Sequence, residues 1–261
     1  MNENLENMHG KVVAITGGAG GIGFAIADAC SQAGMKVAIG DLDPAASTKA
    51  ANALTGPASG LTVDVTDRDS FATFLADTED ALGPLHALIN NAGVLISGPF
   101  AEASPQSVQA QVDVNLGGVL TGTHLALERF VPRGEGHVVN MASTASMVAS
   151  PNGATYSATK HAVLGFTRAL RGELRGTGVS TTAVMPGVIR TEMTKSFRPA
   201  FGVRVIGPEV VGQTVLKALS ERTPEVYAPA EVALQGRLFT MLPAKLSDRL
   251  QRLTGADRVV H

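Results

Sequence analysis

The sequence predicts an α/β protein with a doubly wound parallel sheet, and three observations support this fold class. Short β-branched runs alternate with longer amphipathic stretches from residue 11 onward. The runs are apolar almost throughout, as in strands whose two faces are both covered. A glycine cluster separates the first run from the helical stretch that follows, which is the order of a nucleotide-binding unit. Repeated strand and helix indicate parallel strands with helices on both faces.

Six segments are expected to be strands and five to be helices. The expected strands are residues 11–16, 36–41, 61–65, 86–90, 136–143 and 179–186. The expected helices are residues 23–34, 44–54, 69–82, 107–130 and 156–176. Ligands of such sheets bind beyond the carboxyl ends of the strands, so the residues that follow each strand are the candidates for a site.

The composition describes one globular domain over residues 1–261. Its 44% hydrophobic content and formal net charge of −2 argue against disorder and against a nucleic-acid partner. The single cysteine, Cys30, excludes an internal disulfide framework, and with six scattered histidines it forms no metal-ligand cluster. The polar start lacks the apolar run of a signal peptide, and no stretch is long and apolar enough to span a membrane. We therefore expect a cytoplasmic protein without a metal.

Residues 16–23, TGGAGGIG, form the first strand-to-helix turn. Glycines let this backbone turn tightly and approach a pyrophosphate, whose charge the amide groups at the helix N-terminus meet. The predicted dinucleotide-binding residues of the turn are Gly17, Gly21, Ile22 and Gly23. Asp41 ends the second strand, where a carboxylate accepts hydrogen bonds from ribose hydroxyls and repels a 2′-phosphate. Neither the turn nor Leu42 supplies a cation, so NAD is favoured over NADP.

Tyr156 and Lys160 lie four positions apart and share one face of a predicted helix. Such a pair is weak evidence alone. It occurs here with NNAG at 90–93, Asp64 in a DV pair, Asn115 in VDVNLGG, Ser143 in NMASTAS and PGVIRT at 186–191. In this order and approximate spacing, over about residues 10–230, the motifs resemble those of the short-chain dehydrogenase/reductase family.

The resemblance implies a Rossmann fold and hydride transfer between NAD(H) and a secondary alcohol or ketone. It implies a catalytic tetrad, whose members are Asn115, Ser143, Tyr156 and Lys160. Tyr156 would remove the alcohol proton while Ser143 orients the substrate oxygen. A free tyrosine has a pKa of about 10, and Lys160 together with the nicotinamide ring would favour the phenolate. Lys160 would also hold the nicotinamide ribose, and Asn115 would bind a water that connects Lys160 to solvent.

The resemblance also implies further cofactor positions. They are Asp64, Val65, Asn91, Ala92, Gly93, Pro186, Gly187, Ile189 and Thr191, with Tyr156 and Lys160. Asn90 is assigned mainly to the scaffold.

Residues 191–208 correspond to the family's substrate lid, and they are largely apolar between their charges. The predicted substrate contacts are Met193 and Phe197 in the lid, Met147, Ser143 and Tyr156. An apolar lid favours a lipophilic alcohol or ketone of the steroid, retinoid or long-chain kind, although the same residues would equally pack on the protein itself.

Residues 230–261 are predicted to form a C-terminal helical extension. Many family members end in a strand followed by a paired-glycine segment, and the departure from this pattern puts a tetramer in doubt. Residues 242–253 predict an amphipathic helix, with Lys245, Arg249 and Arg252 on a basic face. We prefer its packing against this or a partner subunit over peripheral contact with a membrane, and we expect a homo-oligomer, either a dimer or a tetramer.

Two other functions stay open. One is an NADPH-dependent ketoreductase acting on 3-ketoacyl thioesters, against which Asp41 argues. The other is a sensor that binds NAD(H) without turnover, since fold alone never establishes activity. The presence of the whole tetrad argues against the sensor.

Overall fold

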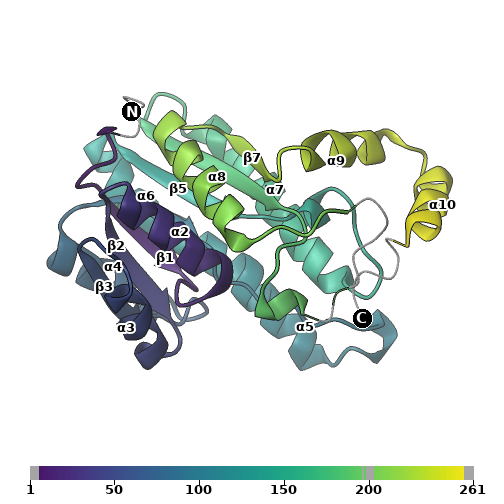
Figure 1. Ribbon diagram of the computed structural model, residues 1–261, viewed down its shortest axis with the longest axis horizontal. Coiled ribbons are helices and arrows are strands. Elements are labelled where there is room, and N and C mark those ends of the chain that lie inside the picture. The colour runs from purple at the N-terminus through teal and green to yellow at the C-terminus, as the bar shows by residue number, and fades with distance from the viewer. Residues whose placement is uncertain (1–5, 196, 198–202, 256–261) are drawn as a thin grey trace.

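A sheet of seven parallel strands forms the centre of the protein, and the computed structural model describes residues 6–195, 197 and 203–255. The strands are β1 (Val12–Thr16), β2 (Lys36–Asp41), β3 (Ala58–Thr62), β4 (Leu85–Asn90), β5 (Gly136–Met141), β6 (Val179–Pro186) and β7 (Glu225–Ala228). Their order across the sheet is β3-β2-β1-β4-β5-β6-β7 (Figure 1). This is a single doubly wound domain of the Rossmann type, which confirms the predicted fold class.

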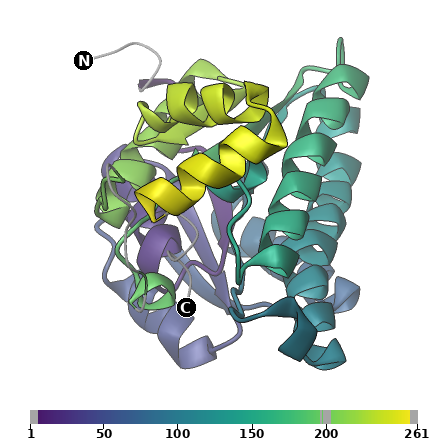
Figure 2. The same cartoon turned by 90° about the vertical axis from the view of Figure 1, so that its right-hand side faces the viewer.

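Helices cover both faces of the sheet (Figures 1 and 2). The α-helices of the described chain from residue 21 onward are α2 (Gly21–Gln32), α3 (Pro44–Asn52), α4 (Arg68–Leu82), α5 (Pro105–Val112), α6 (Gly118–Arg133), α7 (Ala154–Glu173), α8 (Pro208–Glu221), α9 (Val232–Met241) and α10 (Ala244–Thr254). Alternate residues of β1 point to opposite faces: Val13 and Ile15 pack with α2 and α8, whereas Val12 and Ala14 pack with α4 and α6. Each strand therefore needs apolar residues at nearly every position.

Strand β3 begins and ends three residues earlier than the pattern predicted. Residues 61–65 contain the apolar run, but the ladder with β2 pairs Val37 with Ala58 and ends at Thr62. Gly60 lies directly against α3, because a Cβ there would come within 2.4 Å of the Ser47 carbonyl oxygen. Close packing of a helix thus selects a glycine where the pattern looks for a β-branched residue.

The strand β7 and the helix α8 were not expected from the pattern. β7 has four residues and extends the sheet beside β6, with Val184 opposite Val226. The chain therefore has the strand of the family pattern, and its departure from that pattern concerns only the segment after β7. α8 begins with Pro208, packs along α2 and buries Val211 and Val215 against it (Figure 1).

The helix predicted over residues 107–130 is interrupted. α5 passes into a π-helical turn at Asp113–Gly117 before α6 begins. The wider turn buries Asn115 completely. Single π-helical turns within α-helices are frequent at functional sites.

Two segments flank the carboxyl edge of the sheet. The predicted lid begins with a 3₁₀ turn at Glu192–Thr194, and a parallel bridge between Ile189 and Ile206 joins its two ends. Residues 196 and 198–202 of that lid, and 256–261 of the C-terminal extension, lie outside the described residues. α9 and α10 form an arm beyond β7, away from the layers that enclose the sheet (Figures 1 and 2). Within the described chain, no helix is long and apolar enough to cross a membrane.

Candidate active site

A cavity of about 480 Å³ opens at the carboxyl edge of the sheet, where the strand order reverses between β1 and β4. Crevices at this switch point are the usual ligand sites of doubly wound sheets. Every predicted cofactor residue lines the cavity, and so do Ser143 and Met193. Lining residues that the sequence interpretation did not single out are Gly20, Leu42, Val63, Val94, Val114, Met141, Ala142, Glu192 and Thr194.

The glycine turn brings β1, α2 and the end of β4 into close contact. Gly17 has a φ of +61°, and a Cβ there would lie 2.9 Å from the Ala92 Cα. A Cβ on Gly23 would lie 2.2 Å from the Gly17 carbonyl oxygen. Gly20 begins α2 without a side-chain cap, and the first turn of α2 holds no acidic residue. The first amide groups of α2 are thus available to an anion such as a pyrophosphate.

Asp41 and Asp64 differ in how much of each carboxylate the protein itself uses. One oxygen of Asp41 accepts a hydrogen bond from the Ala19 amide at 3.2 Å, which ties the glycine turn to the end of β2. The Asp64 carboxylate accepts from both the amide and the hydroxyl of Thr66, at 2.9 and 2.7 Å. The remaining lone pairs of Asp41 suit ribose hydroxyls, whereas Asp64 first holds its own turn.

The two asparagines at the end of β4 have separate environments. The Asn91 amide group donates to the carbonyl oxygens of Thr16 and Gly17, both at 3.0 Å, so it fastens β4 to the glycine turn. Asn90 is buried and donates to Thr123 and Asn140, as expected of a scaffold residue. Thr16, which was not singled out, accepts from the amide nitrogens of residues 91 and 92 through its hydroxyl.

Ser143, Tyr156 and Lys160 come together beside the cavity from two elements. Ser143 follows β5 and caps a 3₁₀ turn at Thr144–Ser146, whereas the other two lie in the first turns of α7. The side chains of Ser143 and Tyr156 are hydrogen-bonded. The Lys160 ammonium lies 5.6 Å from the centre of the Tyr156 ring and donates to the Met141 carbonyl oxygen at 2.8 Å.

Ser146 holds these two elements in register, and sequence reasoning missed it. Its hydroxyl donates to the Lys160 carbonyl oxygen at 2.8 Å and accepts from the Ser143 amide at 3.2 Å. Only its place three residues after a capping serine signals this role in the sequence. The result is a short bridge that fixes the Ser143 backbone to helix α7.

Burial shifts the pKa values of the lysine and the tyrosine. It lowers the pKa of the Lys160 ammonium from 10.5 to about 8. It raises the pKa of the Tyr156 phenol, which the hydrogen bond with Ser143 lowers in part. Burial is the larger of the two effects at Tyr156, because loss of solvent penalises the phenolate more than the hydrogen bond with Ser143 stabilises it. That Lys160 and the nicotinamide ring favour the phenolate stays a prediction.

Asn115 does not line the cavity. Its side chain pairs with Val94 in both directions, accepting from the amide and donating to the carbonyl oxygen, each at 2.8 Å. It also donates to the Thr159 hydroxyl at 3.3 Å. Through these bonds the π-helical turn holds the loop after β4 against helix α7, close to Lys160.

Two of the predicted substrate residues do not line the cavity. Met147 packs against α9, where a Cβ on Gly236 would lie 2.3 Å from the methionine Cε. Phe197 is partly buried in the lid, with its amide bonded to the Thr194 carbonyl oxygen at 3.0 Å. Each therefore contacts the protein itself, which is the alternative that the sequence left open.

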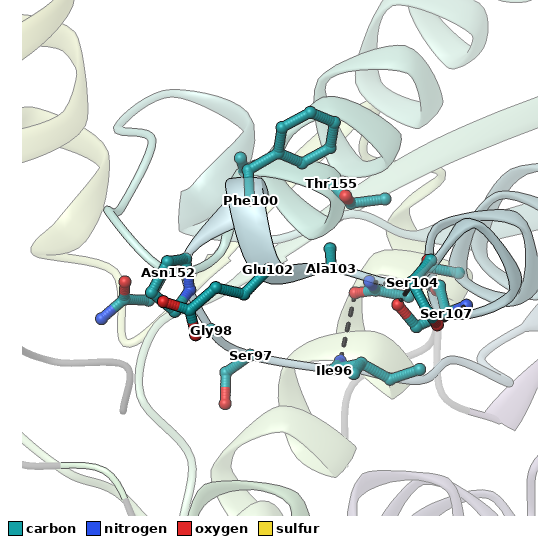
Figure 3. A pocket seen from close by; sticks show the side chains of 13 residues that line it. Ile96, Ser97, Gly98, Phe100, Glu102, Ala103, Ser104, Ser107, Asn152 and Thr155 are labelled. Atoms are coloured by element: carbon teal, nitrogen blue, oxygen red, sulfur yellow. Dashed lines mark hydrogen bonds between the residues drawn. The ribbon is translucent and has the colours of Figure 1, made fainter.

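A second cavity of about 310 Å³ lies between the loop after β4 and the start of α7 (Figure 3). Phe100, Glu102, Ser104 and Thr155 are among its lining residues, and the Ile96 amide donates to Gln111 at 3.1 Å beside it. It shares no lining residue with the first cavity. We therefore assign it no part in the chemistry at Tyr156.

Known proteins resemble this chain over most of its length. It matches the short chain dehydrogenase family over residues 11–201. It is 32% identical to 2-(S)-hydroxypropyl-CoM dehydrogenase 3 of Xanthobacter autotrophicus, over 98% of this chain and 96% of that protein. It is 34% identical to the acetoacetyl-CoA reductase of Paracoccus denitrificans, over 86% of this chain and 90% of that protein.

The fold is similar to a solved short chain dehydrogenase/reductase from Burkholderia phymatum in complex with NAD. The TM-score is 0.81 at 26% identity, covering 88% of this chain and 93% of that one. The chain belongs to the short-chain dehydrogenase/reductase family, which is a family of oxidoreductases. Within the described residues, no group of three or more His, Cys, Asp and Glu side chains could hold a metal ion.

Proposed function

We propose that the protein transfers a hydride between NAD(H) and a secondary alcohol or ketone, and that the substrate is lipophilic. The observation that carries this proposal is the meeting of Ser143, Tyr156 and Lys160 in the cavity that the glycine turn and Asp41 also line. Relatives named as a dehydrogenase and a reductase support the reaction class. A bound nicotinamide dinucleotide would supply the hydride acceptor or donor.

In this mechanism the protein's own groups bind the substrate oxygen and move one proton. The Ser143 hydroxyl orients the oxygen. The Tyr156 phenolate accepts the alcohol proton during oxidation, and the Tyr156 phenol donates a proton to the substrate oxygen during reduction. Lys160, with a pKa of about 8, exchanges protons readily near neutral pH, and its ammonium lies 5.6 Å from the centre of the Tyr156 ring. Asn115 acts as a positioning residue, because its bonds to Val94 hold the cavity wall beside Lys160.

Cofactor selection rests on charge in this proposal. The Asp41 carboxylate stands at the cavity, and among the hydrogen bonds of the described residues its one partner is the Ala19 amide. Like charges brought together cost several kcal/mol, so this carboxylate disfavours a 2′-phosphate and selects NAD. The solved relative bound to NAD agrees with this choice.

A lipophilic substrate is supported by Met193, which lines the cavity at the start of the proposed lid and remains 43% exposed. The bridge between Ile189 and Ile206 keeps the two ends of this segment together beside the cavity. We also propose a cytoplasmic location. Cys30 supports it, because a single cysteine allows no internal disulfide, which fits a reducing compartment.

The test measures absorbance at 340 nm with NADH and NADPH, on steroid, retinoid and secondary-alcohol panels. Tyr156→Phe is expected to lower kcat at least about 100-fold. Tyr227→Phe changes the other tyrosine of the chain, on β7, and is the matched control. Cofactor binding with no Tyr156-dependent turnover on any panel would instead favour the sensor.

Asp41→Asn tests the cofactor choice. The amide oxygen can still accept from Ala19, so only the charge is removed. We expect the ratio of kcat/KM with NADH to that with NADPH to fall at least about tenfold. A preference of the wild-type protein for NADPH over NADH would instead favour the ketoreductase. The similarity to an acetoacetyl-CoA reductase is the observation that supports that alternative.

A further inference from the structure

Helix α9 has apolar residues on two opposite faces. Val232, Gly236 and Phe239 recur at i, i+4 and i+7 and form one of them. Gly236 is buried against Met147. Val232 lies near Gly187 of the cavity wall, since a Cβ on Gly187 would lie 3.6 Å from the Val232 side chain. This face attaches α9 to the body of the protein.

The opposite face of α9 points into solvent. Leu234, Leu238 and Met241 also recur at i, i+4 and i+7, and they are 65%, 55% and 80% exposed. Isolated exposed leucines are ordinary on protein surfaces, but a row at helical spacing is the pattern of a contact face. The folding of the described chain does not account for it.

Helix α10 continues the exposed surface with two rows side by side. The apolar row is Leu246, Leu250 and Leu253, and the basic row is Lys245, Arg249 and Arg252. Each row recurs at i, i+4 and i+7, and the rows are offset by one residue, so they are neighbours on the helix surface. α10 buries no residue within the described chain, and Leu253 is 72% exposed.

The charge of the arm indicates what covers it. Residues 232–255 contain four basic side chains and one acidic one, whereas the whole chain has a net charge of −2. Two arms pairing with each other would bring like charges together, which opposes that contact. An anionic surface with an apolar interior satisfies the basic row and the apolar rows at once.

We propose that the arm of residues 232–255 docks on an anionic lipid surface. The apolar rows of α9 and α10 enter the headgroup boundary, and the basic row meets the lipid phosphates. The sequence alone had favoured protein packing for this segment. Five of the six apolar side chains in these rows are exposed, all except Leu250, and so is the whole basic row. This exposure changes that preference, and the proposal stands independently of the hydride-transfer function.

The base of the arm is next to the candidate active site. Val232 adjoins Gly187, and Met147 follows Ser143 in the chain. Glu231 forms an ion pair with Arg204, in the last part of the lid, at 3.7 Å. Docking would therefore hold the cavity close to the lipid. If the proposed function is right, a lipophilic substrate would reach the cavity from there.

The test is flotation of the full-length protein with phosphatidylcholine vesicles, prepared with and without phosphatidylglycerol. Wild type is expected to float with the anionic vesicles only, and added salt is expected to weaken the binding. The triple variant Lys245→Gln/Arg249→Gln/Arg252→Gln is expected to lower the partition coefficient about 100-fold, at about fivefold for each charge. Leu234→Gln/Leu238→Gln is expected to lower it at least about tenfold.

Matched controls make the same changes on other exposed surfaces. They are Lys49→Gln/Arg175→Gln/Lys217→Gln for the charges and Val210→Gln for the apolar surface. Circular dichroism verifies that each variant folds. Equal binding to both kinds of vesicle, no binding, or arm variants that bind like the controls would overturn the proposal. Light scattering tests whether a second copy of the chain covers the arm instead. A wild-type oligomer that the Leu234→Gln/Leu238→Gln variant dissociates, together with no binding of wild type to the vesicles, would identify that second copy and would also overturn the proposal.

Discussion

His137 in strand β5 makes the stability of the fold depend on pH in a way that the structure quantifies. It is 6% exposed, and its Nε2 atom lies 2.8 Å from the Thr182 hydroxyl oxygen. That hydroxyl donates its one hydrogen to the Thr223 carbonyl oxygen at 2.6 Å. Nε2 must therefore be the donor to Thr182, so the neutral ring carries its proton on Nε2.

Burial, with a smaller contribution from Arg222, lowers the pKa of His137 from 6.5 to about 3. Below pH 6.5 the unfolded chain binds a proton at this residue, and the folded chain does not until the pH approaches 3. Stability from His137 is thus present above pH 6.5 and is lost as the pH falls. The loss is about 1.4 kcal/mol between pH 7.5 and 5.5 and about 2 kcal/mol by pH 5.

The assay is urea denaturation of wild type and His137→Gln at pH 7.5, 6.5, 5.5 and 5. The glutamine amide can donate to Thr182 but does not titrate, so the difference between the two proteins isolates His137 from every other group. We expect the stability advantage of wild type to shrink by about 1.4 kcal/mol from pH 7.5 to 5.5. A difference that stays constant over this range would refute the reasoning.

Two other substitutions test contacts around the cavity by the same denaturation method. Gly23→Ala places a Cβ against the Gly17 carbonyl oxygen and is expected to cost about 1–3 kcal/mol. Gly165→Ala, in an open position on α7, is the control and is expected to stabilise by up to about 1 kcal/mol. Asn115→Leu leaves both polar groups of Val94 without their partner and is expected to cost about 1–3 kcal/mol. Equal stability of the two glycine variants would contradict the assignment at Gly23. A free energy of unfolding of Asn115→Leu equal to that of wild type would contradict the assignment at Asn115.

Sequence reasoning reached the central strands because they are buried on both faces. Strand β1 is almost continuously apolar, and that pattern is independent of its neighbours. At the edges the pattern is weaker. β7 has four residues with a glutamate and a tyrosine, and β3 contains a glycine that its contact with α3 requires.

The part of the candidate site that could be predicted consists of residues whose type is set by their position at the end of a strand or in a turn. The glycine turn, Asp41, Ser143, Tyr156 and Lys160 all line the cavity, because the ends of parallel strands meet at one edge. Met147 does not line this cavity, because its side chain packs on a glycine in α9, nearly ninety residues further along the chain, and its contact with substrate stays a prediction. Contacts of this kind leave no local pattern.

By itself, the sequence determined the fold class, the order along the chain of the motifs that follow the central strands, and the chemical groups that face the cavity. These follow from local periodicity and from turns that only glycine can form. Only the tertiary structure decided that a π-helical turn buries Asn115 on Val94, that burial raises the pKa of Tyr156, and that the arm leaves its apolar rows in solvent. Burial, hydrogen-bond partners and pKa shifts depend on which distant segments meet, and the spacing of residues along one chain does not contain that information.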